Sequence, residues 1–403
     1  MALGGGTWSP AVEQAVIRLG TWLPFERVPR ELAALVGVTI GRETVRRRTE
    51  AAGAALVAAE AAAVEQLGRT WPPPDGGEAG WYQVSVDGAM VPLVHGQWAE
   101  VKTLAVGRLE RRPRADGTGR VRATALSYFS RLADADTFRR LAWVETHRRG
   151  LTLAPRVCAV TDGAEWCQHF IDWHAPQAVR ILDFPHAAEY VAAAGRSVFG
   201  ADSPALIAWL DQHLHALKHG DPDRVLAALR ALPAVSLPGP EGPRCPRDEA
   251  LAYLTKRRAQ IAYASFQAAG LPIGSGVVES ANKLVVEARL KGSGMHWARA
   301  NVDPMLALRG AVCSDRWDAA WAALRAEQHR QTAARRARRG TAREAARPTP
   351  PPPAPTAPST AEQCRRVARL PLGRRANGRP SADHPWRKPF LRRRSTDPTP
   401  ARS

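Results

Sequence analysis

Hydrophobic positions recur with two different periods along the chain, and the change from one to the other predicts where helices and strands lie. Residues 1–70 place apolar side chains at helical spacing, and so do residues 187–268. Between these regions, short apolar runs predict strands, with a helix over residues 135–150 among them. Strands that alternate with helices indicate an α/β fold for the middle of the chain.

The predicted strands begin with two long segments, WYQVSVDGAMVPL at residues 81–93 and WAEVKTLAVGRLE at residues 98–110. We expect these two to be antiparallel neighbours joined by a turn at Val94–Gln97. Shorter strands are predicted at residues 121–129, 157–160 and 179–184. A linker is predicted before them, in WPPPDGGEAG at residues 71–80, because its composition is rich in proline and glycine.

The N-terminal helical region contains a candidate helix-turn-helix in RELAALVGVTIGRETVRRRTEAAG, residues 30–53. Gly37 offers the turn, and a short basic helix follows it. We expect its arginines to meet phosphates, and Thr44 or Arg47 to meet base edges. An ordinary helical hairpin with a solvated basic face explains the same segment equally well. The candidate DNA contacts here are Thr44, Arg46, Arg47 and Arg48.

Most of the formal net charge of +19 lies in residues 331–403, which hold 18 Arg and Lys against 4 Asp and Glu. Together with the proline-rich run at residues 348–361, this composition predicts a disordered basic tail that buries too little apolar surface to fold. A polycationic arm favours nucleic acid as its partner. A solubilising tail, or arginine enrichment in a GC-rich genome, is the alternative.

The expected cellular location depends on whether the sequence contains membrane spans, a signal peptide or paired cysteines. No apolar run approaches the roughly 18 residues that a membrane span needs, and the N-terminus carries no signal-peptide pattern. The five cysteines are odd in number and form no CxxC pair, which indicates reduced thiols. We therefore expect a cytoplasmic protein without a membrane partner.

Acidic side chains stand at or just beyond the ends of three predicted strands, as Asp87, Asp162 and Asp183. In α/β sheets, functional groups collect at such ends. A single strand-end aspartate is usually a helix cap or a turn residue. Several of them together suggest an oxygen-ligand site for a hard cation such as Mg²⁺, since the carboxylates would otherwise repel one another.

A fourth carboxylate occurs in GSGVVESANKLVVEARLKGSGMHW, residues 274–297, which opens with glycines and continues as a predicted helix. Its buried stripe is expected to hold Val278, Ala281, Val285 and Ala288. Glu279 lies in the first turn, where the helix dipole favours a carboxylate, and Glu287 is the rival acid. A surface amphipathic helix is the alternative interpretation. The candidate DNA contacts here are Lys283, Arg289, Lys291 and Trp297.

Several motifs of this chain resemble, in their order, those of the ISKra family of bacterial insertion-sequence transposases, which are similar in layout to mutator-like transposases. The resemblance runs from about residue 25 to about residue 320, and RPSADHPWRKP at residues 379–389 resembles the C-terminal end of the family. The motifs that carry it are VSVDGAMVPLVHGQWAEVK, VTDGAEW, ILDFPHAAEYV, GSGVVESANK and ARLKGSGMHW.

The resemblance implies a DDE catalytic triad in which Asp87 is the first aspartate, Asp162 the second and Glu279 the glutamate, all three serving as metal ligands. Asp183 and His186 match a D-x-x-H signature and are expected to be supporting residues. Asp183 remains an alternative second aspartate, because it too ends a strand.

The fold implied is an RNase H-like catalytic core over residues 81–330, interrupted by an all-helical insertion at about residues 187–268. Two Mg²⁺ ions, or Mn²⁺ in their place, would serve cleavage of the element's ends and strand transfer into target DNA. The implied partner is double-stranded DNA, on which the protein would assemble as a homo-oligomer in the bacterial nucleoid. A transposase-derived DNA-binding regulator without nuclease activity is the alternative.

Overall fold

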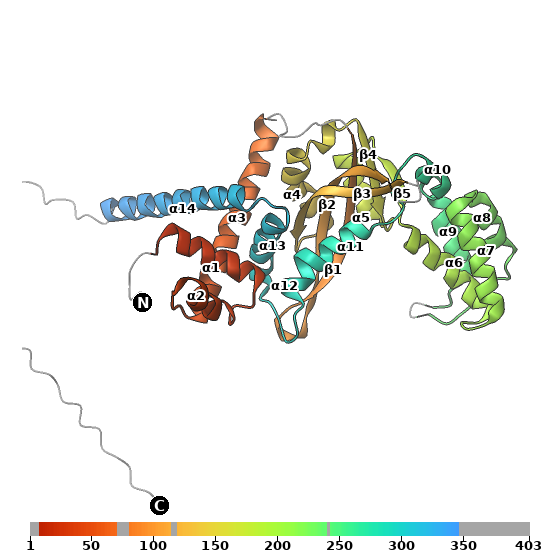
Figure 1. Ribbon diagram of the computed structural model, residues 1–403, viewed down its shortest axis with the longest axis horizontal. Coiled ribbons are helices and arrows are strands. Elements are labelled where there is room, and N and C mark those ends of the chain that lie inside the picture. Colours follow the sequence, from red (N-terminus) through yellow and green to blue (C-terminus); the bar gives the residue numbers. More distant parts are fainter. Residues whose placement is uncertain (1–7, 71–79, 114–118, 240–241, 346–403) are drawn as a thin grey trace, which may run out of the picture. The chain divides into compact units, whose positions relative to one another are not determined.

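A mixed five-stranded sheet lies at the centre of the protein, with strand order β3-β2-β1-β4-β5 (Figure 1). The computed structural model describes residues 8–70, 80–113, 119–239 and 242–345. Strands β1, β2 and β3 are antiparallel neighbours, whereas β4 runs parallel to both β1 and β5. The predicted strands and the predicted β1–β2 pairing are thus confirmed. Their bounds are Trp81–Pro92, Trp98–Pro113, Gly119–Arg131, Arg156–Thr161 and Val179–Leu182 for β1 to β5.

Alternate side chains of β1 pack into two different hydrophobic cores. Val84 and Val86 point to one face, where they join residues of α4 (Ala135–Arg148) and α5 (Glu165–His174). Ala89 and Val91 point to the other face and join α11 (Gly276–Ala281) and α13 (Arg299–Cys313). Because side chains of a strand alternate between faces, Asp87 shares the α11 face with Ala89.

The segment between β5 and α11 is helical, as predicted, and packs in a hydrophobic cluster that also includes Val160 of β4 and Ile181 of β5. Its first helix begins before residue 187, at Phe184, because the Asp183 carboxylate caps it by accepting a hydrogen bond from the His186 amide at 3.1 Å. The helices are α6 (Phe184–Phe199), α7 (Pro204–His219), α8 (Pro222–Ala231), α9 (Pro246–Lys256) and α10 (Tyr263–Ala268).

The N-terminal region forms α1 (Pro10–Trp22), α2 (Val28–Val36) and α3 (Arg42–Thr70). Gly37 ends α2 in the left-handed conformation, with φ 64°, as expected for the turn. The expectation of a short second helix is wrong, since α3 runs for 29 residues. Its later turns pack against α13, in a cluster that includes Ile17, Leu56, Leu308, Val312 and Trp317.

Gly53 marks the closest approach of α3 to α13, since a Cβ there would lie 2.2 Å from the Pro304 carbonyl oxygen. Gly53→Ala is therefore expected to destabilise the protein by about 1–3 kcal/mol, because backbone atoms of α13 cannot move aside as a side chain can. Gly68→Ala is the matched control in the same helix, where the nearest atom is 3.9 Å away. It should gain up to about 1 kcal/mol from helix propensity. Equal thermal shifts in the two variants would contradict this packing.

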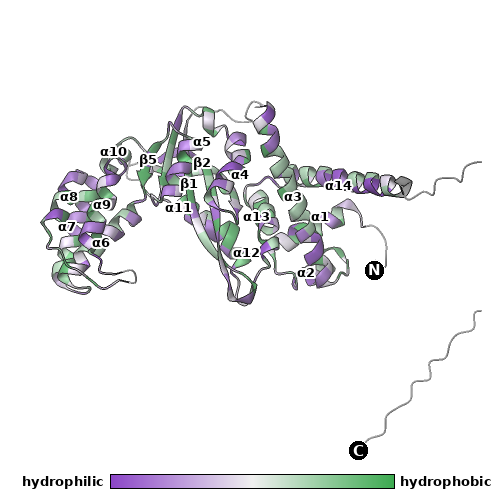
Figure 2. Cartoon of the chain, turned by 180° about the vertical axis from the view of Figure 1, so that it is seen from behind, coloured by the Kyte–Doolittle hydropathy of each residue, from purple (hydrophilic) through white to green (hydrophobic). Residues whose placement is uncertain are grey.

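Helix α14 (Trp317–Ala345) corrects the predicted boundary of the disordered tail. Residues 331–345 are helical, because alanine, arginine, glutamine and glutamate are favourable helix formers. Hydrophilic residues cover much of this helix toward its C-terminal end (Figure 2). The rest of the predicted tail, residues 346–403, and all but the last residue of the predicted linker lie outside the described residues.

No helix in the described ranges combines the length and the apolar character needed to cross a bilayer.

Candidate active site

The three candidate catalytic carboxylates come from three neighbouring elements. Asp87 lies in β1, Asp162 follows the last residue of β4, and Glu279 lies in α11. The parallel register pairs Val84 with Ala159, so continuing it places Asp87 level with Asp162. Helix α11 packs on the face of β1 that carries Asp87. The sheet register and this helix therefore direct all three side chains to one region.

The electrostatic environment of Asp87 includes the other two candidate carboxylates. Burial is the largest cause that raises the pKa of Asp87, and the negative charges of Asp162 and Glu279 raise it further. Two hydrogen bonds oppose the rise. The Gly88 amide donates to Asp87 Oδ1 at 2.7 Å, and Asn282 Nδ2 donates to Asp87 Oδ2 at 2.9 Å. The site thus concentrates negative charge that a cation would offset.

This raised pKa predicts how stability depends on pH. Because the folded-state pKa of Asp87 lies above its unfolded value, the folded protein binds more protons in the window between the two, and acidification through that window stabilises it. At pH 7 the ionised Asp87 carboxylate destabilises the folded protein, because its pKa is raised. Asp87→Asn should therefore slightly raise the thermal midpoint of the metal-free protein at pH 7, and it should abolish the stabilisation by acid. Asp134→Asn is the control of opposite sign, since hydrogen bonds from Thr137 lower the pKa of Asp134. Thermal melts between pH 4 and 8 would measure both, and a loss of stability in Asp87→Asn at pH 7 would contradict the sign.

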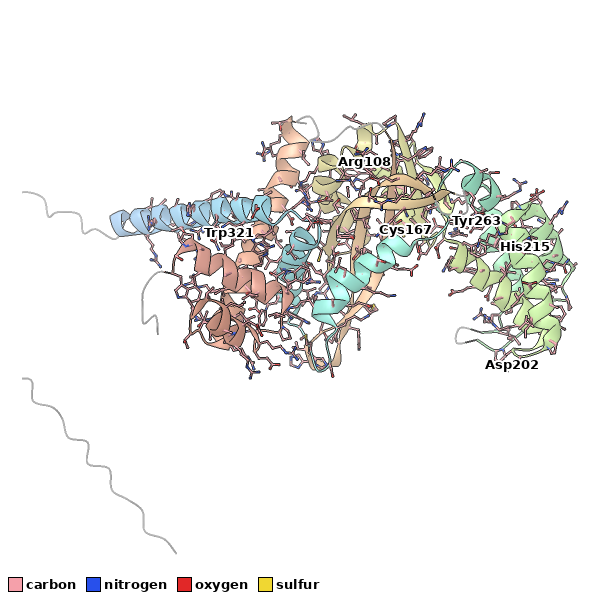
Figure 3. All side chains as sticks on the ribbon, in the orientation of Figure 1. Arg108, Cys167, Asp202, His215, Tyr263 and Trp321 are labelled. Atoms are coloured by element: carbon pink, nitrogen blue, oxygen red, sulfur yellow. The ribbon has the colours of Figure 1, made fainter. Side chains whose placement is uncertain are left out.

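The other two carboxylates are held by short-range contacts. Asp162 Oδ1 accepts hydrogen bonds from the Ala164 amide at 2.9 Å and from the thiol of Cys167, with Sγ at 3.4 Å. Cys167 lies on α5 and is buried in the core that α5 forms with the sheet (labelled in Figure 3). Glu279 Oε1 accepts from Ser275 Oγ at 2.9 Å. These bonds fix the orientation of each carboxylate relative to its own loop or helix.

Both carboxylate oxygens of Asp183 accept hydrogen bonds from backbone amides. Oδ2 accepts from the His186 amide, and Oδ1 accepts from the Ser275 amide at 2.7 Å. Asp183 is buried, and it ties the start of α6 to the loop before Glu279. The His186 ring meets Tyr190 and Tyr253 edge-on, with centroids 5.5 and 5.7 Å apart. The charges that act on Asp87 are those of Asp162 and Glu279.

Oxygen donors of this kind suit Mg²⁺ or Mn²⁺. One further observation fits a cation site: Asn282 Oδ1 is buried beside Asp87 and has no hydrogen-bond partner among the described residues. The spacing, however, is wider than a bound ion requires. Across the described ranges, no three His, Cys, Asp or Glu side chains are near enough to hold a metal ion together. The carboxylates would have to move closer to share one.

The helical pitch changes three residues after Glu279. Residues Asn282–Glu287 form a π-helical turn, and α12 (Ala288–Leu290) completes the element. Wider turns of this type occur often at functional sites. The turn also corrects the predicted buried stripe, because it rotates Ala288 to the surface and brings Asn282, Val286, Arg289 and Leu290 into the interior.

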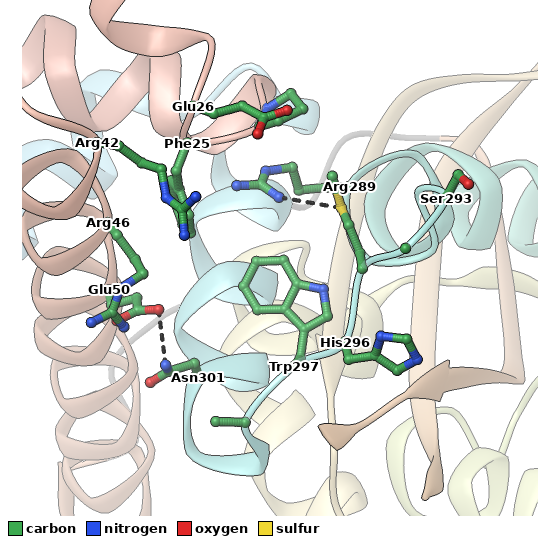
Figure 4. A pocket seen from close by; sticks show the side chains of 14 residues that line it. Phe25, Glu26, Arg42, Arg46, Glu50, Arg289, Ser293, His296, Trp297 and Asn301 are labelled. Carbon is green, nitrogen blue, oxygen red and sulfur yellow. Dashed lines mark hydrogen bonds and ion pairs between the residues drawn. The ribbon is translucent and has the colours of Figure 1, made fainter. Parts of the chain in front are cut away.

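Arg289 and Trp297, two of the candidate DNA contacts, line the wall of a cavity of about 440 Å³ between the N-terminal helices and residues 293–298 (Figure 4). Arg289 is only 2% exposed, so its charge does not face a surface where a phosphate backbone could lie. Its guanidinium lies over the rings of Phe25 and Trp297, at 4.6 and 5.1 Å, and burial lowers its pKa to about 10. Trp297 is also buried, and its indole donates to the Leu290 carbonyl at 3.2 Å.

The remaining candidate DNA contacts differ in how free their charges are. Arg46 pairs with Glu43 at 2.6 Å and with Glu50 at 2.7 Å. Arg47 and Arg48 are exposed and have looser acidic neighbours, at 4.0 and 3.6 Å. Thr44 is half-buried, Lys283 is exposed, and Lys291 pairs with Glu287. Exposed cations therefore remain on α3 and near Glu279.

Sequence reasoning missed the residues that hold the site together, namely Tyr253, Arg257, Cys167, Ser275 and Asn282. Asn282 was recoverable in part, because it lies three residues after Glu279 and shares its face of the predicted helix. Tyr253 and Arg257 carry no local signal, since their partners lie more than 90 residues away in the chain. Ser275 and Cys167 lie only four and five residues from Glu279 and Asp162.

Comparison with known proteins adds no identification: the chain matches no protein-family model, and no curated protein matches it.

Proposed function

We propose that this chain is a DNA transposase of the DDE type, which cleaves phosphodiester bonds at the ends of an insertion sequence and joins the freed 3′-OH to target DNA. One observation carries the proposal: the charges of Asp162 and Glu279, both far from Asp87 in the sequence, act on Asp87 in the folded chain. Carboxylates held in this way serve metal-dependent phosphoryl transfer.

The topology supports an RNase H-like core for this function. Three antiparallel strands are followed by two parallel ones, in the order β3-β2-β1-β4-β5, and the helices α6–α10 stand between β5 and the helix with Glu279. That position is the one expected for an all-helical insertion. The D-x-x-H segment, as Asp183 and His186, lies where the inserted helices begin.

Two Mg²⁺ ions held by Asp87, Asp162 and Glu279 would activate the attacking oxygen and stabilise the leaving one. The protein's own contribution is to orient the carboxylates. Asn282 and the Gly88 amide hold Asp87, the Ala164 amide holds Asp162, and Ser275 holds Glu279.

Double-stranded DNA is the proposed partner, and basic side chains in a cavity beside α11 support it. A cavity of about 910 Å³ runs beside α11, with Arg112 and Arg122 from β2 and β3 on one side and residues 274–280 on the other. Arg112 and Arg122 in this cavity would attract a phosphate backbone without selecting its sequence.

The test is strand cleavage by the purified full-length protein on DNA that carries the inverted repeats flanking its coding region. Nicks that leave 3′-OH ends in Mg²⁺ or Mn²⁺, and none in EDTA, are expected. DNA binding without cleavage in either metal would refute the proposal.

A DNA-binding regulator without nuclease activity is the second candidate. It is favoured by the spacing of the carboxylates, since no three metal-ligating side chains of the described residues converge on one point. The same cleavage assay distinguishes the two functions.

A further inference from the structure

Helix α9 reaches across to the loop that carries Asp162 and binds its backbone. The Tyr253 hydroxyl donates a hydrogen bond to the Asp162 carbonyl oxygen. Arg257, directly after α9, donates twice to the Gly163 carbonyl oxygen, from Nε at 3.1 Å and from Nη2 at 2.5 Å. Tyr253 and Arg257 are called here the backbone clamp. These contacts join positions more than 90 residues apart in the sequence.

The backbone clamp is itself held rigidly. The Arg257 guanidinium lies 3.8 Å from the centre of the Tyr253 ring, and Arg257 is only 6% exposed. The Tyr253 ring stacks on the Tyr190 ring, with the ring centroids 4.1 Å apart and an angle of 9° between the ring planes. Such stacking leaves the phenol little freedom to turn away from the Asp162 carbonyl.

The loop is shaped to receive the clamp. Gly163 has φ 81°, a conformation that favours glycine, and a Cβ there would lie 2.6 Å from both Arg257 Nε and the Tyr253 oxygen. The next amide, that of Ala164, donates to Asp162 Oδ1. The backbone that the clamp holds therefore also aims the carboxylate.

We propose that Tyr253 and Arg257 are positioning residues for Asp162, so that the helical segment between β5 and α11 sets the geometry of the carboxylate site. The metal-binding part of this proposal rests on the proposed function, whereas the effect on the loop does not. Residues that orient a metal ligand typically change metal affinity or activity by about 10–100-fold when mutated.

Four full-length variants form two matched pairs. Tyr253→Phe removes the clamping hydroxyl, and Tyr190→Phe removes a hydroxyl from the same stack that makes no hydrogen bond within the described residues. Arg257→Lys replaces the two-point donor, and Arg258→Lys changes the neighbouring exposed arginine, which pairs with Asp223.

Hydrogen exchange of the metal-free proteins tests the clamp without any activity. Peptides that cover residues 160–168 should exchange several-fold faster in Tyr253→Phe and Arg257→Lys, and at the wild-type rate in both controls. Unchanged exchange in the clamp variants, equal acceleration in the controls, or acceleration across the whole chain would overturn the proposal.

Binding of Mn²⁺, followed by the loss of its free-ion EPR signal without DNA, tests the consequence for the site. Both clamp variants should need about tenfold more Mn²⁺ for half-saturation, with excess metal restoring cleavage. Wild-type affinity in the clamp variants would defeat the positioning role alone. A wild-type protein that neither binds Mn²⁺ nor cleaves DNA would defeat the proposed function, whatever the exchange rates show.

Discussion

Replacing any one of Asp87, Asp162 and Glu279 by its amide is expected to reduce metal-dependent strand cleavage by at least about a hundredfold. An amide keeps the shape of the side chain but is a poor ligand for a hard cation. Affinity for DNA should change little, because the proposed phosphate contacts are made by cations and not by these carboxylates. Cleavage and gel-shift assays on the same end fragment measure the two effects together.

Glu287→Gln is the matched control for this prediction. Glu287 is the rival acid in the same helical element, and it pairs with Lys291 at 2.8 Å, whereas the charges that act on Asp87 are those of Asp162 and Glu279. The Glu287→Gln variant should cleave DNA as the wild type does. Wild-type cleavage by any of the three triad variants would remove that residue from the catalytic set, and loss of cleavage in Glu287→Gln would show that charge anywhere on this element matters.

Ending the chain after Ala345 is expected to weaken all DNA binding and to flatten its dependence on salt. The removed residues, 346–403, hold 13 Arg and Lys against 3 Asp and Glu. Each neutralised phosphate contributes roughly −0.9 to the slope of log affinity against log salt, so if about five cations engage, the slope should fall in magnitude by about 4 to 5. Cutting after Ala345 keeps α14 whole, which a cut at residue 331 would not.

A full-length variant with these arginines changed to glutamine is the control, since it keeps the length and the prolines. It should reproduce the truncation in salt titrations on both specific and random duplexes. Preference for the element's ends should persist in both proteins, because arm contacts to phosphates carry no base readout. An unchanged slope, or a loss confined to specific DNA, would show that these residues act as a folded accessory.

The strands and most helices could be predicted because their signals are local. Val84 and Val86 pack on one face of β1 while Ala89 and Val91 pack on the other, and Gly37 ends α2 as a left-handed glycine should. Predictions failed where a helix depends on distant packing. Helix α3 is long because its later turns bury Leu56 against α13, and the π-helical turn after Ala281 reverses the exposure of Ala288 and Arg289.

The sequence by itself determined the periods of the strands and helices, the carboxylates at the ends of β4 and early in α11, and the concentration of positive charge near the C-terminus. Each of these depends on residues close together in the chain. Only the tertiary structure decided which charges act on Asp87, how Asp183 ties α6 to the Glu279 loop, and that Tyr253 and Arg257 hold the backbone at Asp162. The physical reason is that hydrogen bonds and Coulomb interactions between distant segments depend on distances in space, which the local periodicity of a sequence does not contain.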